Sequence, residues 1–92
     1  MGGEVKAPRL VADLPPDYPR QAVLSRIQGD VEIDAVIDRD GNVVQAHAVN
    51  GPPLLISAAL KAVSMWKYAP TYLNGKRYPV ELTVHLTFLL GA

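Results

Sequence analysis

Residues 78–90 alternate between apolar and polar side chains. The even positions from Val80 onward are apolar, and the odd positions are polar except for Leu89. A period of two predicts a strand with one buried face. Pro79 stands at its start, where a residue without an amide hydrogen is tolerated. Beyond Glu81 no charged residue discourages another chain from pairing. This strand is therefore predicted to be either the centre of a sheet or a docking edge.

A second alternating segment covers residues 30–38. A turn follows at residues 38–42, and the returning strand is predicted over residues 43–49. The faces of the returning strand are ambiguous because Val43 and Val44 are adjacent and both apolar. The apolar face of the first strand consists of Val31, Ile33, Ala35 and Ile37.

Two segments have the period of a helix. The first is predicted over Pro19–Gln28, with Gly29 supplying the left-handed residue that ends it. The second is predicted from Pro53 to about Trp66, as the main cover of the sheet. Its apolar stripe consists of Leu55, Ile56, Ala59, Leu60, Ala62, Val63 and Trp66, and it leaves Ser57, Lys61 and Ser64 outside.

The remaining segments connect these elements. Residues 1–17 contain three prolines and no steady period, so they are predicted to be an extended lead-in or the end of a linker to a domain at residues 18–92. Residues 66–73 are predicted to be extended. Asn74-Gly75 is the strongest two-residue hairpin signal in the chain, and it leads into the last strand.

These elements predict an α+β fold in the order α-β-β-α-β. Its three-stranded antiparallel sheet has two helices packed on one face, plus a short extra extended segment before the last strand. A right-handed crossover through the second helix places the last strand beside the first. The last strand is then an edge, and we expect residues 83–89 to stay open.

Composition limits the functions that this fold can serve. The chain has 92 residues, enough for one domain. Its nine basic and nine acidic residues give a formal net charge of zero, and no basic stripe predicts binding to nucleic acid or anionic lipid. Without cysteine, disulfides and thiol catalysis are excluded. The opening Met1-Gly2-Gly3 is typical of an expression start, so we expect one domain of a longer protein.

The sequence offers little for catalysis or cofactor binding. His47 and His85 fall on different predicted strands, and we interpret them as structural rather than as a metal pair. Neither has an obvious carboxylate to orient it, and no nucleophile with a partnered base can be assembled. Asp38, Asp40 and Asn42 lack the spacing of a calcium loop and are interpreted as a turn. We therefore expect no enzyme activity, no metal and no cofactor.

Several motifs together resemble the C-terminal domain of TonB-type energy transducers. The resemblance covers about residues 18–90, nearly the whole domain. The motifs are Tyr18-Pro19 before a short helix ending at Gly29, Asp40-Gly41 in a hairpin, Ala58-Ala59-Leu60 on a helix, Trp66-Lys67-Tyr68-Ala69-Pro70, Asn74-Gly75 and the alternating last strand.

The resemblance implies a periplasmic module, attached through a proline-rich linker to an inner-membrane helix and driven by an inner-membrane proton-channel complex. Its partner would be the Ton box, a short peptide of an outer-membrane TonB-dependent transporter. In that family the peptide adds as a strand to the last strand, which here corresponds to Thr83, Val84, His85, Leu86, Thr87, Phe88 and Leu89. Accessory contacts are expected from Tyr18, Arg20, Lys76 and Arg77. The family's contacting glutamine, three residues before the Tyr-Pro pair, is replaced here by Pro15.

Structural alternatives exist for each of these assignments. Tyr18 could pack against the second helix, and Lys76-Arg77 could be a solvated turn. The edge strand could be covered by residues 4–17 or by an identical subunit. The alternative function is a structural or self-assembly domain of a cell-envelope protein, which would form homodimers through the same edge.

Overall fold

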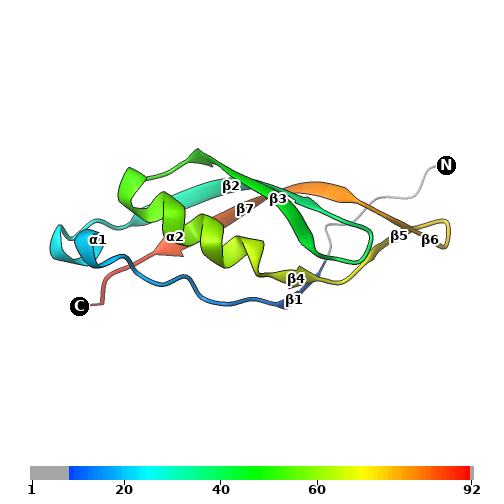
Figure 1. The fold of residues 1–92 in the computed structure, drawn as a ribbon, viewed down its shortest axis with the longest axis horizontal. Coiled ribbons are helices and arrows are strands. Elements are labelled where there is room, and N and C mark those ends of the chain that lie inside the picture. Colours follow the sequence, from blue (N-terminus) through cyan, green and yellow to red (C-terminus); the bar gives the residue numbers. More distant parts are fainter. Residues whose placement is uncertain (1–8, 92) are drawn as a thin grey trace.

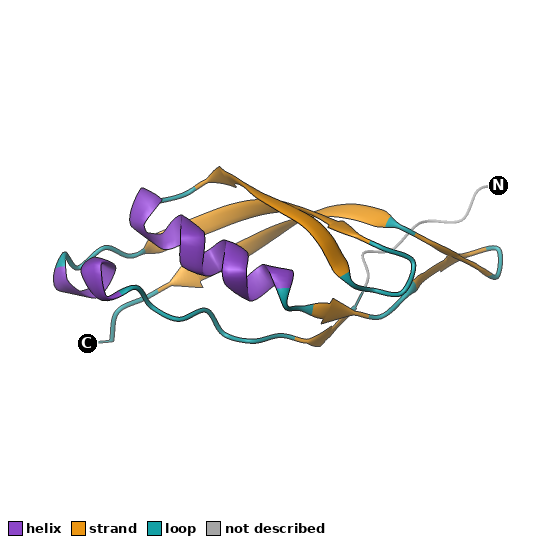
Figure 2. Cartoon of the chain, viewed as in Figure 1, coloured by secondary structure: helices purple, strands orange, loops and turns teal. Residues whose placement is uncertain are grey.

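A computed structural model describes residues 9–91 of the chain. Residues 1–8, which include Met1-Gly2-Gly3 and the first part of the predicted lead-in, and residue 92 lie outside the described residues. The described part is elongated, with extents of 51 × 23 × 22 Å. Both helices lie on one side of a three-stranded antiparallel sheet (Figures 1 and 2), so the predicted fold class is confirmed. The helices are α1 (Arg20–Leu24) and α2 (Pro53–Ser64), and the strands of the main sheet are β2 (Gly29–Ile37), β3 (Val43–Asn50) and β7 (Val80–Phe88).

The main sheet has the strand order β3-β2-β7, as the sequence predicts. Strand β2 is central and pairs antiparallel with both neighbours. Its pairing with β7 runs from Gly29 opposite Phe88 to Ile37 opposite Val80, without a shift of register. The last strand is therefore held along its whole length by one neighbour.

Strand β3 is interrupted at both ends of its ladder. Glu32 pairs with Asn50 while Ile33 pairs with Ala48, so Val49 is an extra residue in β3. Val44 is extra in the same way at the other end. Both valines are more than half exposed. Such bulges explain why the faces of this strand are ambiguous in the sequence, because each one interrupts the period of two.

The first helix is shorter than the predicted Pro19–Gln28. It ends at Leu24, and Arg26 adopts the left-handed conformation (φ 54°) that we expected at Gly29. The amide of Arg26 donates to the carbonyl of Val23, and that of Ile27 to the carbonyl of Ala22. This is the Schellman arrangement of a helix end. Gly29 instead opens β2, so the predicted helix end was wrong by four residues and the predicted left-handed residue by three.

The core lies between α2 and the sheet. The predicted stripe is confirmed: Leu55, Ala59, Ala62 and Val63 are buried, with Ile56, Leu60 and Trp66 packed at the margin of the core. Pro53 occupies the first turn, where its missing amide hydrogen is not needed. From the sheet, the predicted apolar face of β2 is buried at Val31, Ile33, Ala35 and Ile37.

Two small sheets extend the main body. Strands β5 (Thr71–Leu73) and β6 (Lys76–Tyr78) form the predicted hairpin, in which Asn74 and Gly75 both have positive φ. Strand β1 (Leu10–Ala12) pairs with β4 (Lys67–Tyr68), a pairing that was not predicted from the sequence. The indole nitrogen of Trp66 also donates to the Leu14 carbonyl, at 2.9 Å. The described part of the lead-in thus lies against β4 and α2, not along β7 (Figure 1).

Candidate functional site

Strand β7 has an unpaired side. Among residues 9–91, only β2 pairs with it. In an antiparallel ladder every second residue turns its N–H and C=O groups away from the paired neighbour. No other backbone–backbone hydrogen bond within the described residues involves Val80–Phe88. The predicted residues Thr83 to Phe88 lie within this open strand, and Leu89 follows it directly.

The side chains of β7 divide between two faces of the sheet. Val84, Leu86 and Phe88 are buried on the helix-covered face. Thr83, His85 and Thr87 are exposed on the other face, as the alternation predicts. Leu89 breaks the pattern and is 71% exposed. A chain added beside β7 would therefore meet an apolar row on one face and a polar row on the other.

The polar row is held toward β2. Thr83 Oγ1 donates to Asp34 at 3.0 Å, and Thr87 Oγ1 donates to Asp30 at 2.7 Å. His85 Nδ1 lies 3.9 Å from Glu32 Oε1 between these two bonds. Because these side chains lean toward β2, they do not lie over the unpaired N–H and C=O groups on the other side of β7.

Both histidines lie on the face of the sheet that the helices do not cover, which we call the open face. His47 Nε2 is 3.8 Å from Asp34 Oδ2, so each histidine has a carboxylate neighbour that sequence reasoning missed. The cross-strand register, which spacing alone does not give, creates these pairs. Both distances exceed that of a hydrogen bond. Within residues 9–91 no group of three or more His, Cys, Asp or Glu side chains converges as metal ligands do.

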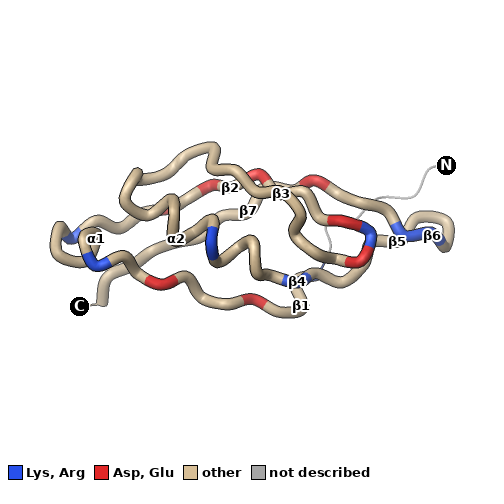
Figure 3. The backbone as a smooth tube through the Cα atoms, in the orientation of Figure 1, with Lys and Arg blue, Asp and Glu red and all other residues tan. Residues whose placement is uncertain are grey.

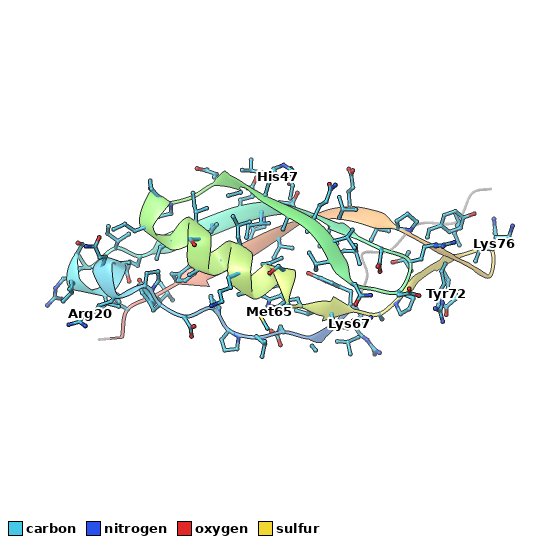
Figure 4. All side chains as sticks on the ribbon, in the orientation of Figure 1. Arg20, His47, Met65, Lys67, Tyr72 and Lys76 are labelled. Atoms are coloured by element: carbon cyan, nitrogen blue, oxygen red, sulfur yellow. The ribbon has the colours of Figure 1, made fainter. Side chains whose placement is uncertain are left out.

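The accessory residues fall at the two ends of β7. The Tyr18 hydroxyl donates to the Ile27 carbonyl, and its ring packs edge to face against Phe88. Tyr18 thus packs against the end of the last strand. Arg20 and Lys76 lie at opposite ends of the molecule (Figure 4). The site residues predicted at the two ends therefore cannot act on the same part of a ligand.

At the Val80 end, a hollow of about 660 Å³ is lined by Arg39, Asp40, Lys76, Arg77, Tyr78 and Pro79, and we call it the basic hollow. Arg77 Nη1 contacts Asp40 Oδ1 at 3.1 Å, and its Nε donates to the Tyr72 hydroxyl at 3.2 Å. This hydrogen bond from Arg77 to Tyr72 is the main cause that raises the pKa of Arg77.

Lys76 and Arg77 belong to strand β6 rather than to the turn. Sequence reasoning did not connect them with Arg39, which comes from the β2–β3 turn.

The two edges of the main sheet are protected differently. The β3 edge carries the bulges at Val44 and Val49, which twist an edge away from flat pairing. The β7 edge is regular over nine residues and contains no proline, lysine or arginine. Of the two, only β7 presents a regular, uninterrupted edge to another strand.

Comparisons with known proteins agree with this architecture. Residues 15–90 match the model of the Gram-negative bacterial TonB protein C-terminal family. The chain belongs to the TonB C-terminal domain family. It is 34% identical over 85 residues to a Vibrio cholerae protein described as Protein TonB, covering 89% of this chain and 34% of that one. The chain thus spans about a third of the length of this TonB relative.

The fold is also that of a TonB domain. The solution structure of the Pseudomonas aeruginosa TonB C-terminal domain matches with a TM-score of 0.74 at 23% identity, over 91% of this chain and 87% of that one. The TonB family is one of energy transducers for transport and not a known enzyme family. Within residues 9–91, the longest helix has 12 residues, and none can cross a bilayer.

Proposed function

We propose that this domain binds the Ton box of an outer-membrane TonB-dependent transporter by adding it as a strand to β7. The observation that carries the proposal is the difference between the edges. Strand β7 offers nine regular residues, whereas β3 is bulged at Val44 and Val49. In strand addition, backbone hydrogen bonds supply affinity, and alternate side chains supply specificity.

The expected complex is weak and reversible. Each backbone hydrogen bond contributes a net stabilisation of about 0.5–1.5 kcal/mol, and ordering a flexible peptide opposes part of it. Weak binding suits a coupling module that must release its partner. A force that pulls along β7 would act on all of these hydrogen bonds at once, in shear. The β2–β7 ladder would transmit that force to the core of the domain.

The cellular setting of the proposal follows the family. The domain would work in the periplasm, as part of a protein anchored in the inner membrane. A proton-channel complex in that membrane, reached through the N-terminal part of the protein, would supply the energy from the proton gradient. The domain would then deliver this energy to the transporter.

Peptide titration with two N-methylated controls tests strand addition directly. A Ton-box-like peptide should perturb the backbone amide NMR signals of residues 83–89. Methylating every second peptide nitrogen removes donors from only one of its two edges, so one methylated series should lose binding and the other should retain it. Equal behaviour of the two series, or no response at high peptide concentration, would reject the proposal.

The alternative is self-assembly through the same edge. A second copy would use the same unpaired groups of β7, and open edges are where such dimers arise. Sedimentation of the isolated domain would then show a stable dimer. Its amides at residues 83–89 would be protected from hydrogen exchange before any peptide is added.

A further inference from the structure

A hydrogen bond at the β2–β3 turn identifies which residues of β7 have unpaired backbone groups. The amide of Asp38, directly after β2, donates to the carbonyl of Asn42 at 2.8 Å, so the backbone groups of Asp38 point toward β3. Because this direction alternates along a strand, the odd-numbered residues of β2 point toward β7. They pair with the even-numbered residues of β7, without a shift of register. The unpaired N–H and C=O groups of β7 therefore belong to its odd-numbered residues, which are Glu81, Thr83, His85 and Thr87.

Side-chain contacts between β2 and β7 agree with this assignment. In an antiparallel ladder, opposite residues that do not exchange backbone hydrogen bonds have the closer side chains. Thr83 lies opposite Asp34, and its hydroxyl donates to that carboxylate at 3.0 Å. Thr87 lies opposite Asp30 and donates to it in the same way at 2.7 Å. A guest strand would thus exchange backbone hydrogen bonds with the odd-numbered residues, whose side chains are exposed on the open face.

Glu81 is the one permanently charged residue of β7, since the strand contains no other Asp, Glu, Lys or Arg. Its side chain is exposed, and no ion pair within residues 9–91 includes it. The carboxylates of β2 differ in this respect. Asp30 and Asp34 accept threonine hydroxyl groups, and Glu32 lies beside His85. On the guest-binding strand itself, Glu81 is therefore a charge without a partner among the described residues.

The open face around Glu81 has no positive charge to neutralise it. None of the three strands of the main sheet contains a lysine or an arginine, and the carboxylates of β2 follow one another along the strand (Figure 3). A shallow hollow of about 360 Å³ on this face is lined by residues of all three strands, among them Glu81, Asp34 and His47. A side chain that a guest places beside Glu81 would therefore meet a negative surface.

We propose that Glu81 is a specificity-determining residue, which selects a guest peptide with a lysine or arginine directly opposite it. This inference rests on the proposed strand addition to β7. Opposite residues of a ladder have their side chains on the same face, so the guest residue opposite Glu81 also stands on the open face. A basic side chain there forms a cross-strand ion pair with Glu81, whereas an acidic side chain is repelled.

The same ion pair sets the register of the guest. Alternation excludes a shift of one residue along the edge but allows a shift of two, because a two-residue shift keeps every side chain on its face. The other odd-numbered residues, Thr83, His85 and Thr87, already contact carboxylates of β2. Those carboxylates lie one strand farther from the guest than Glu81 does. A basic guest residue is therefore attracted most strongly to the position opposite Glu81.

The test uses an uncharged host peptide of alternating valine and threonine with blocked ends, nine residues long to match β7. Lysine replaces one threonine at a time. Affinities come from NMR titration of the β7 amides, and a spin label at one peptide end reports register by broadening the nearest amides. We expect the best lysine peptide to bind about two- to fivefold more tightly than the host, which is typical of exposed ion pairs. Moving lysine to the next threonine position should move the broadened amides by two residues along β7.

Three variants identify the group responsible, and each is judged by its own ratio of lysine-peptide affinity to host affinity. Glu81→Gln should bring this ratio to about one, and the register should no longer follow the lysine. Glu81→Lys should reverse the preference, so that a peptide with aspartate in place of lysine binds more tightly than the host. Glu32→Gln, which removes a carboxylate of the same face on β2, is the matched control and should keep most of the ratio. In 1 M salt, where the screening length is about 3 Å, the preference for lysine should disappear.

The outcomes separate this inference from the proposed function. If the host peptide perturbs β7 but lysine changes neither affinity nor register, the role of Glu81 is rejected and strand addition stands. The role of Glu81 is also rejected if Glu32→Gln, rather than Glu81→Gln, removes the preference for lysine. If no peptide, charged or uncharged, perturbs β7, strand addition itself is rejected, and this inference with it.

Discussion

The rings of Tyr18 and Phe88 meet edge to face, with centroids 5.4 Å apart and planes at 87°. This contact joins the segment before α1 to the end of the last strand, 70 residues later in the chain. The Tyr18 hydroxyl also donates to the carbonyl of Ile27, just after α1. Tyr18 therefore closes one end of the core and fixes where β7 ends. This contact predicts that a tyrosine at this position stabilises the fold.

Substitutions at Tyr18 should affect stability rather than peptide binding. Tyr18→Phe keeps the ring contact with Phe88 but leaves the Ile27 carbonyl without its donor. It should lower the free energy of unfolding by about 1 kcal/mol. Tyr18→Ala also removes the ring and should cost about 3 kcal/mol. Urea unfolding measures both values. A Tyr18→Phe variant of normal stability that no longer binds peptide would instead show that the hydroxyl contacts the guest.

Two adjacent leucines of α2 provide a matched test of the core. Leu55 is fully buried against the sheet, whereas Leu54 is 38% exposed. Leu55→Ala should lower the free energy of unfolding by about 3 kcal/mol, because it removes buried apolar surface and leaves a cavity. Leu54→Ala should cost less than about 1 kcal/mol. Similar losses in the two variants would mean that α2 is rotated relative to this structure.

Two glycines with positive φ should respond very differently to alanine. At Gly41 (φ +90°) a Cβ would lie 1.8 Å from the Tyr68 carbonyl oxygen, and the Gly41 carbonyl accepts the Tyr68 amide at 2.8 Å. Gly41→Ala should therefore separate the β2–β3 turn from β4 and cost more than about 3 kcal/mol. Gly75 (φ +78°) has open space around it, so Gly75→Ala should cost only about 1 kcal/mol for its backbone conformation. Thermal unfolding of the two variants measures the difference.

The sequence predicted those elements whose signal is local. The alternation of β2 and β7, the apolar stripe of α2 and the Asn74-Gly75 hairpin are each visible in a short window, and the strand order followed from packing rules. The bulges at Val44 and Val49 were not visible, because a bulge is defined by the partner strand. The α1 end was missed because a left-handed arginine, Arg26, has no sequence signature.

The candidate site was predictable only in part. The open edge follows from the alternation together with the strand order, both of which the sequence provides. The basic hollow does not, because Arg39 and Lys76 are 37 positions apart and meet only through the arrangement of two hairpins. The sequence also showed no basic stripe, and its formal net charge is zero. Charges that cancel in composition can still be separated in space.

The β2–β3 turn should make stability depend on pH through Asp38. Its Oδ1 accepts the amides of Asn42 at 2.8 Å and Asp40 at 2.9 Å, and these bonds, that of Asn42 foremost, lower the pKa of Asp38 below its usual value. Because the folded pKa is the lower one, this carboxylate contributes stability above the unfolded pKa of about 4. That contribution is lost as pH falls through the folded value.

Asp38→Asn keeps the shape of the side chain but removes the charge. The variant should be less stable than the parent at pH 7, and the difference should shrink below about pH 4. Urea unfolding at pH 7, 5, 3 and 2 measures it, with Asp17→Asn as the control for net charge. A stability difference that stays constant down to pH 2 would show that the Asp38 charge does not hold the turn.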